Sequence, residues 1–499
     1  MLRALAIGVA AGLCIGLSAA PEEWWALGWL GPGLLLLGLE TWDGRVVRAR
    51  VALAMGMASG FATNAWTMRW AVGLFVDYAY LPWIAALGLA TLLWIAQALP
   101  WGIGCWLAAS ITRERRGWLV LPLAMLVTSS LIPMIFPWRP AVSQTGDTLF
   151  LQVAELGGPP LADALFLLGS CAAFHALRTH DRRIALIALA TIAFPFVYGA
   201  IRIPQVRAAR EAAPLLRVGL VQDGLDVIAR ADGTRTLRDH QAMRRATAQL
   251  EHEGAGLVIW SESAYGFGWA RDRREDPTGE DAFFRDGVHG PLLVGAITGT
   301  WTERWNSVLA LEDGRVTGVA DKVHLMAFTE EVPFWDLLPP LQQIVPRGLS
   351  VGDVRTDVMA IAHTRIGVLN CFEDLVPDHA REVTALGAAL LTNHTNDAWF
   401  GETYAPELHR YLSTMRAVET RRDLVRVVGT GPSGLTNALG ERDAGTPIFV
   451  ATTRIVDART MTTITPWVAL GDVITLPAIA LLLAWIVRAR LAETSARSC

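Results

Sequence analysis

Charged side chains are scarce in this sequence, and the scarcity is uneven. Asp, Glu, Lys and Arg make up 18% of the 499 residues, whereas 52% are hydrophobic, and the mean hydropathy is +0.35. Soluble globular proteins carry about 25% charged residues, so this composition excludes an ordinary soluble protein. Residues 215–465 nevertheless have a normal density of charge. The chain therefore combines a membrane part with a water-exposed part.

A strong net charge, internal repeats and metal-ligand spacings are also absent. The net charge of −4 gives no indication of nucleic-acid binding, and no repeat or low-complexity tract is visible. The histidines from position 324 onward show no paired spacing such as His-x-x-x-His, so we expect no metal and no organic cofactor. They are His324, His363, His379, His394 and His409.

Long hydrophobic runs, in contrast, are abundant. A transmembrane helix takes about 20 apolar residues, and eight runs approach or exceed that length. They lie near residues 3–20, 24–40, 52–75, 81–109, 117–137, 160–177, 184–203 and 466–487. The first run resembles a secretory signal, since it follows Met-Leu-Arg and ends in Ser-Ala-Ala. We expect it to be a retained anchor, because more spans follow.

Arginines cluster in alternate loops between these runs, and basic loops are retained on the cytoplasmic side. The clusters are Arg45, Arg48 and Arg50; Arg113, Arg115 and Arg116; Arg178, Arg182 and Arg183; and Arg488 and Arg490. They predict a cytoplasmic N-terminus. Seven spans then place the charged region on the far side of the membrane, which for a bacterial inner membrane is the periplasm. The predicted parts are a membrane domain of seven helices (1–210), a periplasmic domain (211–465), a transmembrane helix (466–488) and a cytoplasmic tail (489–499).

Cysteine is rare, and Cys371 is the only one in the periplasmic domain. Cys14, Cys105 and Cys171 lie in apolar runs, and Cys499 is the C-terminal residue. Cys371 therefore has no disulfide partner in its own domain. In an oxidising compartment an unpaired thiol is either buried and inert or retained for its chemistry.

The periplasmic domain alternates short apolar strands with polar helices. The strands are predicted at 216–222, 257–262, 292–297, 358–363, 366–370, 388–393 and 424–429, and the clearest helices at about 236–253 and 404–422. This pattern indicates an α/β fold. In such folds, polar side chains at the C-terminal ends of strands face a shared crevice.

Glu262, Lys322 and Cys371 are the candidates for chemistry. Glu262 and Cys371 each end an apolar strand, and Lys322 lies in Val-Ala-Asp-Lys-Val-His-Leu. A carboxylate can take the proton of a thiol, and an ammonium group can stabilise an oxyanion, so together the three types suit acyl transfer. Taken singly, each has an ordinary alternative: a helix-capping glutamate, a solvated lysine or a core cysteine.

The order and surroundings of these residues resemble the nitrilase superfamily, in which Glu follows Ile-Trp-x, Lys precedes His-Leu, and Cys precedes an aromatic residue and Glu. The rest of the chain resembles its membrane-bound branch, the apolipoprotein N-acyltransferase family. The motifs that carry this resemblance are Asn396-Asp397-Ala398-Trp399-Phe400-Gly401, a helix with His409, Met415-Arg416-Ala417 and Glu419, and Phe136-Pro137-Trp138 followed by Gln152-Val153-Ala154.

The resemblance implies a polytopic α-helical membrane protein of about eight spans that carries a nitrilase-like αββα sandwich. It implies that Glu262 is the general base, Lys322 stabilises the tetrahedral intermediate and Cys371 is the nucleophile. Glu330 and Glu373 match supporting carboxylates, although a structural ion pair is the alternative for both. The implied reaction moves the sn-1 acyl chain of a membrane phospholipid through a thioester to the α-amino group of a diacylglyceryl-cysteine apolipoprotein. We expect a monomer.

Aromatic segments beside the predicted site suggest contact with lipid. One is the proline-broken stretch 332–341 with Phe334 and Trp335, and the other is 265–269 with Trp269. Buried loop packing is the alternative for both. Asn396, Trp399 and Phe400 complete the predicted substrate or lipid contacts.

The sequence departs from the family pattern at several positions. Met326-Ala327 and Thr329 replace the usual Val-Pro and Gly, Phe372 replaces Tyr, and the turn 429–434 replaces one richer in asparagine. We expect altered tuning and retained chemistry. Two other hypotheses stay open: a membrane-anchored amidase or nitrilase-type hydrolase, in which water accepts the acyl group, and a non-catalytic sensor or transporter.

Overall fold

The computed structural model describes residues 1–41, 44–112, 116–327, 329–331 and 348–497. The chain divides into two compact units, Met1–Pro204 with Leu470–Cys499, and Gln205–Ala469. Three groups of predictions lie outside the described residues: Arg113 and Arg115, the segment 332–341 with Phe334 and Trp335, and Cys499.

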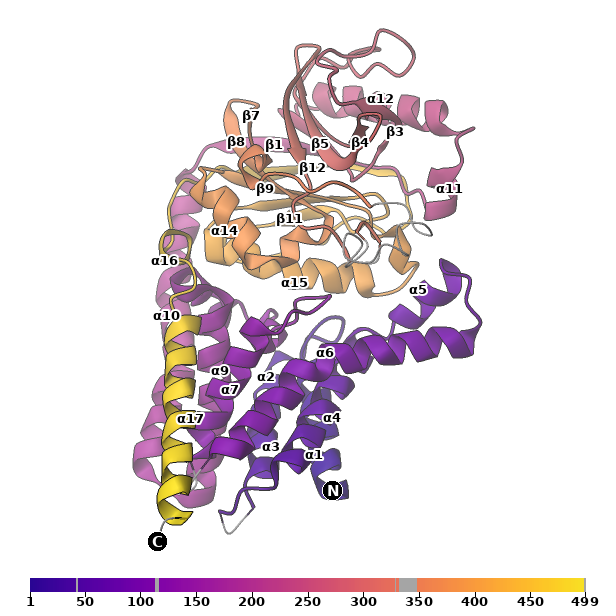
Figure 1. Ribbon diagram of the computed structural model, residues 1–499. Coiled ribbons are helices and arrows are strands. Elements are labelled where there is room, and N and C mark those ends of the chain that lie inside the picture. The colour runs from indigo at the N-terminus through magenta and orange to yellow at the C-terminus, as the bar shows by residue number, and fades with distance from the viewer. Residues whose placement is uncertain (42–43, 113–115, 328, 332–347, 498–499) are drawn as a thin grey trace. The chain divides into compact units, whose positions relative to one another are not determined.

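The first unit is helical (Figure 1). Its helices are α1 (Leu2–Gly16), α2 (Trp25–Gly28), α3 (Leu30–Leu39), α4 (Ala49–Thr67), α5 (Ala71–Asp77), α6 (Trp83–Ile111), α7 (Gly117–Leu131), η1 (Pro140–Gln144), α8 (Thr148–Leu151), α9 (Ala154–Thr179), α10 (Arg182–Ala212) and α17 (Thr475–Arg497). The predicted span at 52–75 is divided between α4 and α5.

Three of these helices, α6, α9 and α10, are long and apolar enough to cross a membrane by length and composition. The segments Leu2–Gly16, Trp25–Leu39, Gly117–Leu131 and Thr475–Ala489 are apolar but shorter. Within the described part of the chain, the structure thus has membrane-type helices, and the count of eight spans stays a prediction.

Glycines allow the helices of this unit to approach closely. A Cβ atom at Gly12 of α1 would lie 2.1 Å from the carbonyl oxygen of Ser59 on α4. One at Gly60 of α4 would lie 2.7 Å from the Cα atom of Ala98 on α6. Small residues at such crossings are typical of membrane helices, which associate through close van der Waals packing.

The second unit contains two β-sheets. The larger sheet has the order β12-β1-β2-β4-β5-β6, and β3 pairs with β4. Its strands are β1 (Leu215–Gln222), β2 (Leu257–Trp260), β3 (Tyr265–Ala270), β4 (Leu292–Gly299), β5 (Arg304–Glu312), β6 (Arg315–Asp321) and β12 (Thr452–Arg459). The smaller sheet has the order β11-β10-β9-β8-β7. Its strands are β7 (Val358–Ile361), β8 (Thr364–Asn370), β9 (Leu390–Thr395), β10 (Leu424–Val428) and β11 (Gly434–Thr436).

The two sheets share one apolar core. Val218 and Ile259 of the larger sheet and Val368 and Val425 of the smaller sheet belong to a single buried cluster. Helix α12 (Thr236–His252) covers the outer face of the larger sheet, and α14 (Pro377–Ala385) and α15 (Ala405–Thr420) cover that of the smaller one (Figure 1). The remaining helices are α11 (Val227–Ala231), η3 (Val354–Asp357), η4 (Cys371–Leu375), η5 (Asp397–Phe400) and α16 (Pro466–Leu470). The layers are therefore α, β, β, α, as expected.

Every strand predicted from the sequence has a counterpart, namely β1, β2, β4, β7, β8, β9 and β10, and both predicted helices match α12 and α15. Strands β3, β5, β6, β11 and β12 were missed. The segment 265–269, which the sequence predicts to be a loop in contact with lipid or packed in the interior, is instead strand β3, with Tyr265 paired to Ala296 of β4.

Candidate active site

Glu262, Lys322 and Cys371 converge in the second unit. Lys322 and Cys371 directly follow strands β6 and β8, Glu262 comes two residues after the end of β2, and Lys322 Nζ lies 3.5 Å from Glu262 Oε1. Glu262 and Lys322 are buried, with exposed fractions of 6% and 2%, whereas Cys371 is partly exposed. The Glu262 carboxylate and the Cys371 thiol also shift each other's pKa, so the two groups lie near one another. The structure therefore places the predicted base beside the predicted nucleophile.

The Cys371 backbone has a left-handed conformation, with φ at +55°. A non-glycine residue rarely adopts this conformation, and such residues cluster at functional sites. Here it turns the chain sharply from β8 into η4. The carbonyl oxygen of Cys371 accepts a hydrogen bond of 2.7 Å from Asn393 Nδ2, so the turn is held from β9.

Glu373 joins this turn to the lysine loop. Its Oε1 accepts hydrogen bonds from the backbone N–H groups of Val323 (2.7 Å) and His324 (2.8 Å), and its Oε2 accepts one of 2.7 Å from the N–H of Asn370. The residue is 1% exposed. Its carboxylate thus fixes the residues next to Lys322 against the residue before Cys371.

Glu330 faces the other side of Lys322. Its Oε2 lies 2.7 Å from Lys322 Nζ and accepts a hydrogen bond of 2.9 Å from the N–H of Met326. Met326 is one of the positions that depart from the family pattern, yet it supports the predicted carboxylate through its backbone, which any residue type except proline supplies.

Asn306 of β5 was not identified from the sequence. Its Nδ2 donates to Glu262 Oε1 at 2.7 Å and to Glu330 Oε1 at 2.9 Å, and its carbonyl oxygen accepts from the N–H of Lys322 at 2.8 Å. One amide group therefore holds both carboxylates around the lysine. An asparagine within a strand gives no local signal, since the contact depends on the pairing of β5 with β6.

Burial and charge set the protonation states of the site. Burial raises the pKa of Glu262, Lys322 opposes this rise, and Glu330 adds to it. Burial and the Glu262 carboxylate also raise the pKa of the Cys371 thiol well above its usual range, although Lys322 opposes the shift. The thiol therefore holds its proton more tightly than an ordinary cysteine, and a nucleophilic role would require a base that takes this proton.

Lys322 stays charged. Burial lowers its pKa, but the facing groups Cys371, Glu262 and Glu330 together raise it above the ordinary value. A buried ammonium group that keeps its charge next to a nucleophile can stabilise a developing oxyanion. Its Nζ also lies 5.4 Å from the centroid of the Phe372 ring, a cation–π contact that requires no phenol hydroxyl group.

The predicted substrate and lipid contacts differ in position. Asn396 lies in the site, since its N–H donates to Glu262 Oε2 at 2.8 Å. The Trp399 side chain is 47% exposed, and the Phe400 ring lies 6.5 Å from that of His409. Trp269 is 3% exposed and belongs to the aromatic cluster under α12, so its indole ring presents little surface to lipid. Phe334 and Trp335 lie outside the described residues.

Among the described residues, no group of three His, Cys, Asp or Glu side chains is arranged to hold a metal ion. The chemistry available to the site is that of a thiol, a carboxylate and an ammonium group. Together they can form and break an acyl–sulfur bond.

Comparisons with known proteins agree with both parts of the chain. A family model for carbon-nitrogen hydrolases matches residues 217–460, and one for the N-terminal domain of apolipoprotein N-acyltransferases matches residues 11–172. An amidase from Nesterenkonia sp. is a solved structure similar to this chain, with 18% identity and a TM-score of 0.36, covering 50% of this chain and 91% of the amidase.

Two curated relatives that cover most of this chain are both apolipoprotein N-acyltransferases. The apolipoprotein N-acyltransferase of Gloeobacter violaceus is 30% identical over 475 residues, covering 89% of this chain and 86% of the relative. That of Geobacter metallireducens is 27% identical over 488 residues, covering 89% and 87%. This chain therefore belongs to the apolipoprotein N-acyltransferase family.

Proposed function

We propose that this membrane-bound acyltransferase takes an acyl chain from a phospholipid, holds it as a thioester on Cys371 and transfers it to the N-terminal amine of a lipoprotein. Membership of the family supports the acylation of a lipoprotein. The observation that carries the proposed mechanism is the convergence of Cys371 and Glu262 beside the charged Lys322, whose Nζ lies 3.5 Å from Glu262 Oε1.

In the first half-reaction, Cys371 Sγ attacks the sn-1 ester carbonyl carbon while Glu262 takes the thiol proton. Lys322 stabilises the resulting oxyanion. The tetrahedral intermediate collapses with cleavage of the bond to the glycerol oxygen, which receives the proton from Glu262 and leaves as the lysophospholipid hydroxyl group. The products are the thioester and an ionised Glu262.

In the second half-reaction, the neutral α-amino group of a diacylglyceryl-cysteine attacks the thioester carbonyl carbon. Glu262 takes a proton from the attacking nitrogen, Lys322 again faces the oxyanion, and the carbon–sulfur bond breaks. The proton returns from Glu262 to Cys371 Sγ, and an amide is released. Glu330 and Asn306 act in both halves by holding Lys322 and Glu262 in place.

The remaining features of the proposal rest on the sequence. The arginine loops support a bacterial inner-membrane protein with eight spans, divided at residues 210, 465 and 488, with the catalytic domain in the periplasm. We place the exposed Trp399, with Phe400, Phe334 and Trp335, among the lipid contacts. We also propose that the enzyme acts as a monomer.

Acyl transfer can be tested on the full-length protein in detergent. Incubation with a phospholipid that carries a fluorescent sn-1 chain should give a protein adduct that neutral hydroxylamine removes, because hydroxylamine cleaves thioesters readily. Cys371→Ser should give no such adduct. Cys14→Ser, which alters another partly exposed thiol, should behave as the wild type.

Addition of a diacylated lipopeptide should then move the label to the peptide. A wild-type protein without an adduct, or an equal adduct on Cys371→Ser, would contradict the thioester. An adduct that is lost to water and never reaches the lipopeptide would instead identify a hydrolase.

A further inference from the structure

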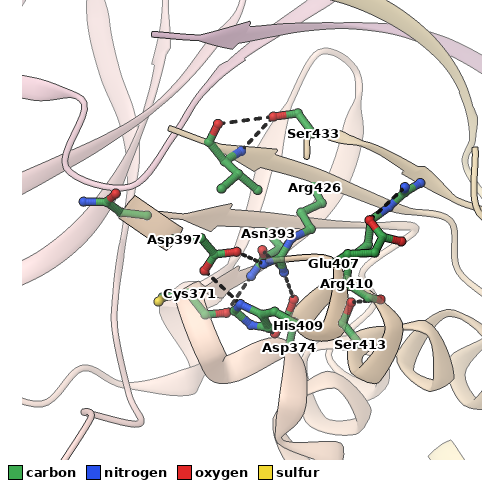
Figure 2. Close-up of polar contacts among 12 residues, drawn as sticks. Cys371, Asp374, Asn393, Asp397, Glu407, His409, Arg410, Ser413, Arg426 and Ser433 are labelled. Carbon is green, nitrogen blue, oxygen red and sulfur yellow. Dashed lines mark hydrogen bonds and ion pairs between the residues drawn. The ribbon is translucent and has the colours of Figure 1, made fainter. Parts of the chain in front are cut away.

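A buried ring of four charged side chains, Asp374, Asp397, His409 and Arg426, lies beside Cys371 (Figure 2). His409 of α15 contacts Asp374 through Nε2 at 2.9 Å and Asp397 through Nδ1 at 3.0 Å. Arg426 of β10 donates to the second oxygen of each carboxylate, through Nη1 to Asp374 and through Nη2 to Asp397 at 2.8 Å. Each carboxylate is thus bound on one oxygen by His409 and on the other by Arg426.

All four members are buried, with exposed fractions of 0% for Asp374, 1% for Asp397, 7% for His409 and 2% for Arg426. Burial and Arg426 lower the pKa of His409, but Asp374 and Asp397 outweigh them and raise it to about 9. The imidazole is therefore protonated at neutral pH, and both of its N–H groups donate. Two positive and two negative charges balance, as a buried cluster requires.

The ring is connected to the turn that carries Cys371 and to the loop that binds Glu262. Asp374 lies in η4, the turn that begins at Cys371. Arg426 Nη1 also donates to Asn393 Oδ1 at 2.9 Å, and Asn393 donates to the Cys371 carbonyl oxygen. Asp397 begins η5 and follows Asn396, whose N–H binds Glu262. One carboxylate of the ring belongs to the nucleophile turn and the other to the loop that holds the base.

We propose that His409 is a positioning residue that holds the Cys371 turn and the Asn396 loop at a fixed separation by donating to Asp374 and Asp397 together. This inference rests on the proposed roles of Cys371 and Glu262. Without the imidazolium, Asp374 and Asp397 share Arg426 alone, and their like charges repel. The turn and the loop then separate, and the thiol and its base lose their alignment.

The test compares His409→Gln with the wild-type protein in detergent. We expect thioester formation from the fluorescent phospholipid to slow by about 10–100-fold, because small misplacements of reacting groups cost this much. The KM for phospholipid should change by less than about 3-fold, since Phe400 is the one proposed lipid contact within the described residues whose ring lies near that of His409. Alkylation of Cys371 by iodoacetamide, followed by mass spectrometry of its peptide, should slow as well.

His240→Gln is the matched control. His240 is a buried histidine of α12, 3% exposed, whose Nε2 lies 3.0 Å from the carbonyl oxygen of Ala282. This variant should lose thermal stability to a similar extent while keeping the wild-type rate per folded molecule. Asp397→Asn conserves the volume of the side chain and removes the carboxylate that His409 Nδ1 contacts. It should slow thioester formation without a matching change in KM, and it replaces His409→Gln in the test if that variant does not fold.

These measurements distinguish failure of the proposed function from failure of the positioning role of His409. If wild-type protein forms no thioester, the proposed function fails. If wild-type protein forms the thioester and folded His409→Gln or Asp397→Asn forms it at the same rate, the positioning role of His409 is wrong. A loss in His240→Gln equal to that in His409→Gln would also overturn the proposal, because it would reduce the effect to stability.

Discussion

At the scale of single residues, the site is a balance of three charges around one thiol. Glu262 must be ionised to accept a proton, yet burial and Glu330 both raise its pKa. Lys322 opposes that rise and remains charged between the two carboxylates. The thiol itself has a raised pKa, so the proposed mechanism depends on proton transfer during attack rather than on a preformed thiolate.

Glu330→Gln should shift the pH profile of thioester formation. The proposed reaction needs the Glu262 carboxylate, so we expect kcat/KM to fall as the pH drops through the pKa of Glu262. Removing the charge of Glu330 lowers that pKa, and the acid limb should therefore move to lower pH. The plateau rate should fall by about 10-fold, because the base weakens and Lys322 loses a partner.

The measurement is kcat/KM between about pH 5 and pH 9, with the thioester as the readout. Glu331→Gln changes the neighbouring, exposed carboxylate and should leave the acid limb in place. An acid limb that stays fixed or moves to higher pH in Glu330→Gln would contradict this account.

Candidate site residues that follow a strand are easier to identify from the sequence than those that lie within a strand. Glu262 and Cys371 follow apolar runs, and a polar residue after such a run is visible without a structure. Asn306 lies near the start of β5, and it reaches Lys322 only because β5 and β6 are antiparallel with Ser307 opposite Asp321. That register depends on long-range pairing, which no local pattern encodes.

At the scale of elements, the site depends on how turns are joined after the strands end. Glu373 accepts three backbone N–H groups from two separate segments, and it completes a capping box with Asn370 at the start of η4. The sequence leaves two roles open for Glu373, that of a supporting carboxylate in the site and that of a member of a structural ion pair. The geometry favours a third role, since the short contacts of the Glu373 carboxylate are to backbone N–H groups and the His379 ring lies farther away, at 3.5 Å.

Glu373→Gln should therefore weaken both stability and catalysis. A glutamine has one oxygen and one N–H₂ group, so either the Val323 and His324 donors or the Asn370 donor would face another donor. We expect a loss of about 1–3 kcal/mol in the free energy of unfolding, the cost of a buried unsatisfied group. Thermal unfolding in detergent measures this loss, and thioester formation should slow at temperatures where the protein is folded.

Glu382→Gln on α14 is a control for this change, because the Glu382 side chain is 45% exposed and pairs only with Arg381 at 3.3 Å among the described contacts. Its unfolding temperature should match that of the wild type. Equal unfolding temperatures for Glu373→Gln and the wild type would contradict the role of Glu373 in joining the Lys322 loop to the Cys371 turn.

Strands β3 and β12 are not predicted from the sequence, because aromatic or charged residues interrupt their apolar pattern. The Tyr-Gly-Phe-Gly-Trp run suggests a loop because glycines interrupt it, yet it forms β3 at the side of β4 and buries Tyr265 and Trp269 against α12. Strand β12 carries charged residues on an edge and pairs with β1 over its full length. Edge strands have only one neighbouring strand, so their apolar pattern is weak.

At the scale of the whole molecule, the sequence predicts which side of the membrane each unit occupies. The helices long enough to cross a membrane, α6, α9 and α10, account for part of the predicted spans, and the apolar segments at 2–16, 25–39, 117–131 and 475–489 are shorter. The arginine clusters are independent of helix length, since basic loops orient a protein through retention on the cytoplasmic side. They therefore provide a separate prediction of topology.

Labelling with a membrane-impermeant maleimide can test that topology in spheroplasts. Trp301 lies in the turn between β4 and β5 and is fully exposed, so a Trp301→Cys thiol in a background with Cys371→Ser and Cys499→Ser should react in intact spheroplasts. His180 lies in the exposed turn between α9 and α10, within an arginine cluster, and His180→Cys should react only after lysis. Reaction of His180→Cys in intact spheroplasts, with protection of Trp301→Cys, would reverse the orientation and place the thioester chemistry on the cytoplasmic side.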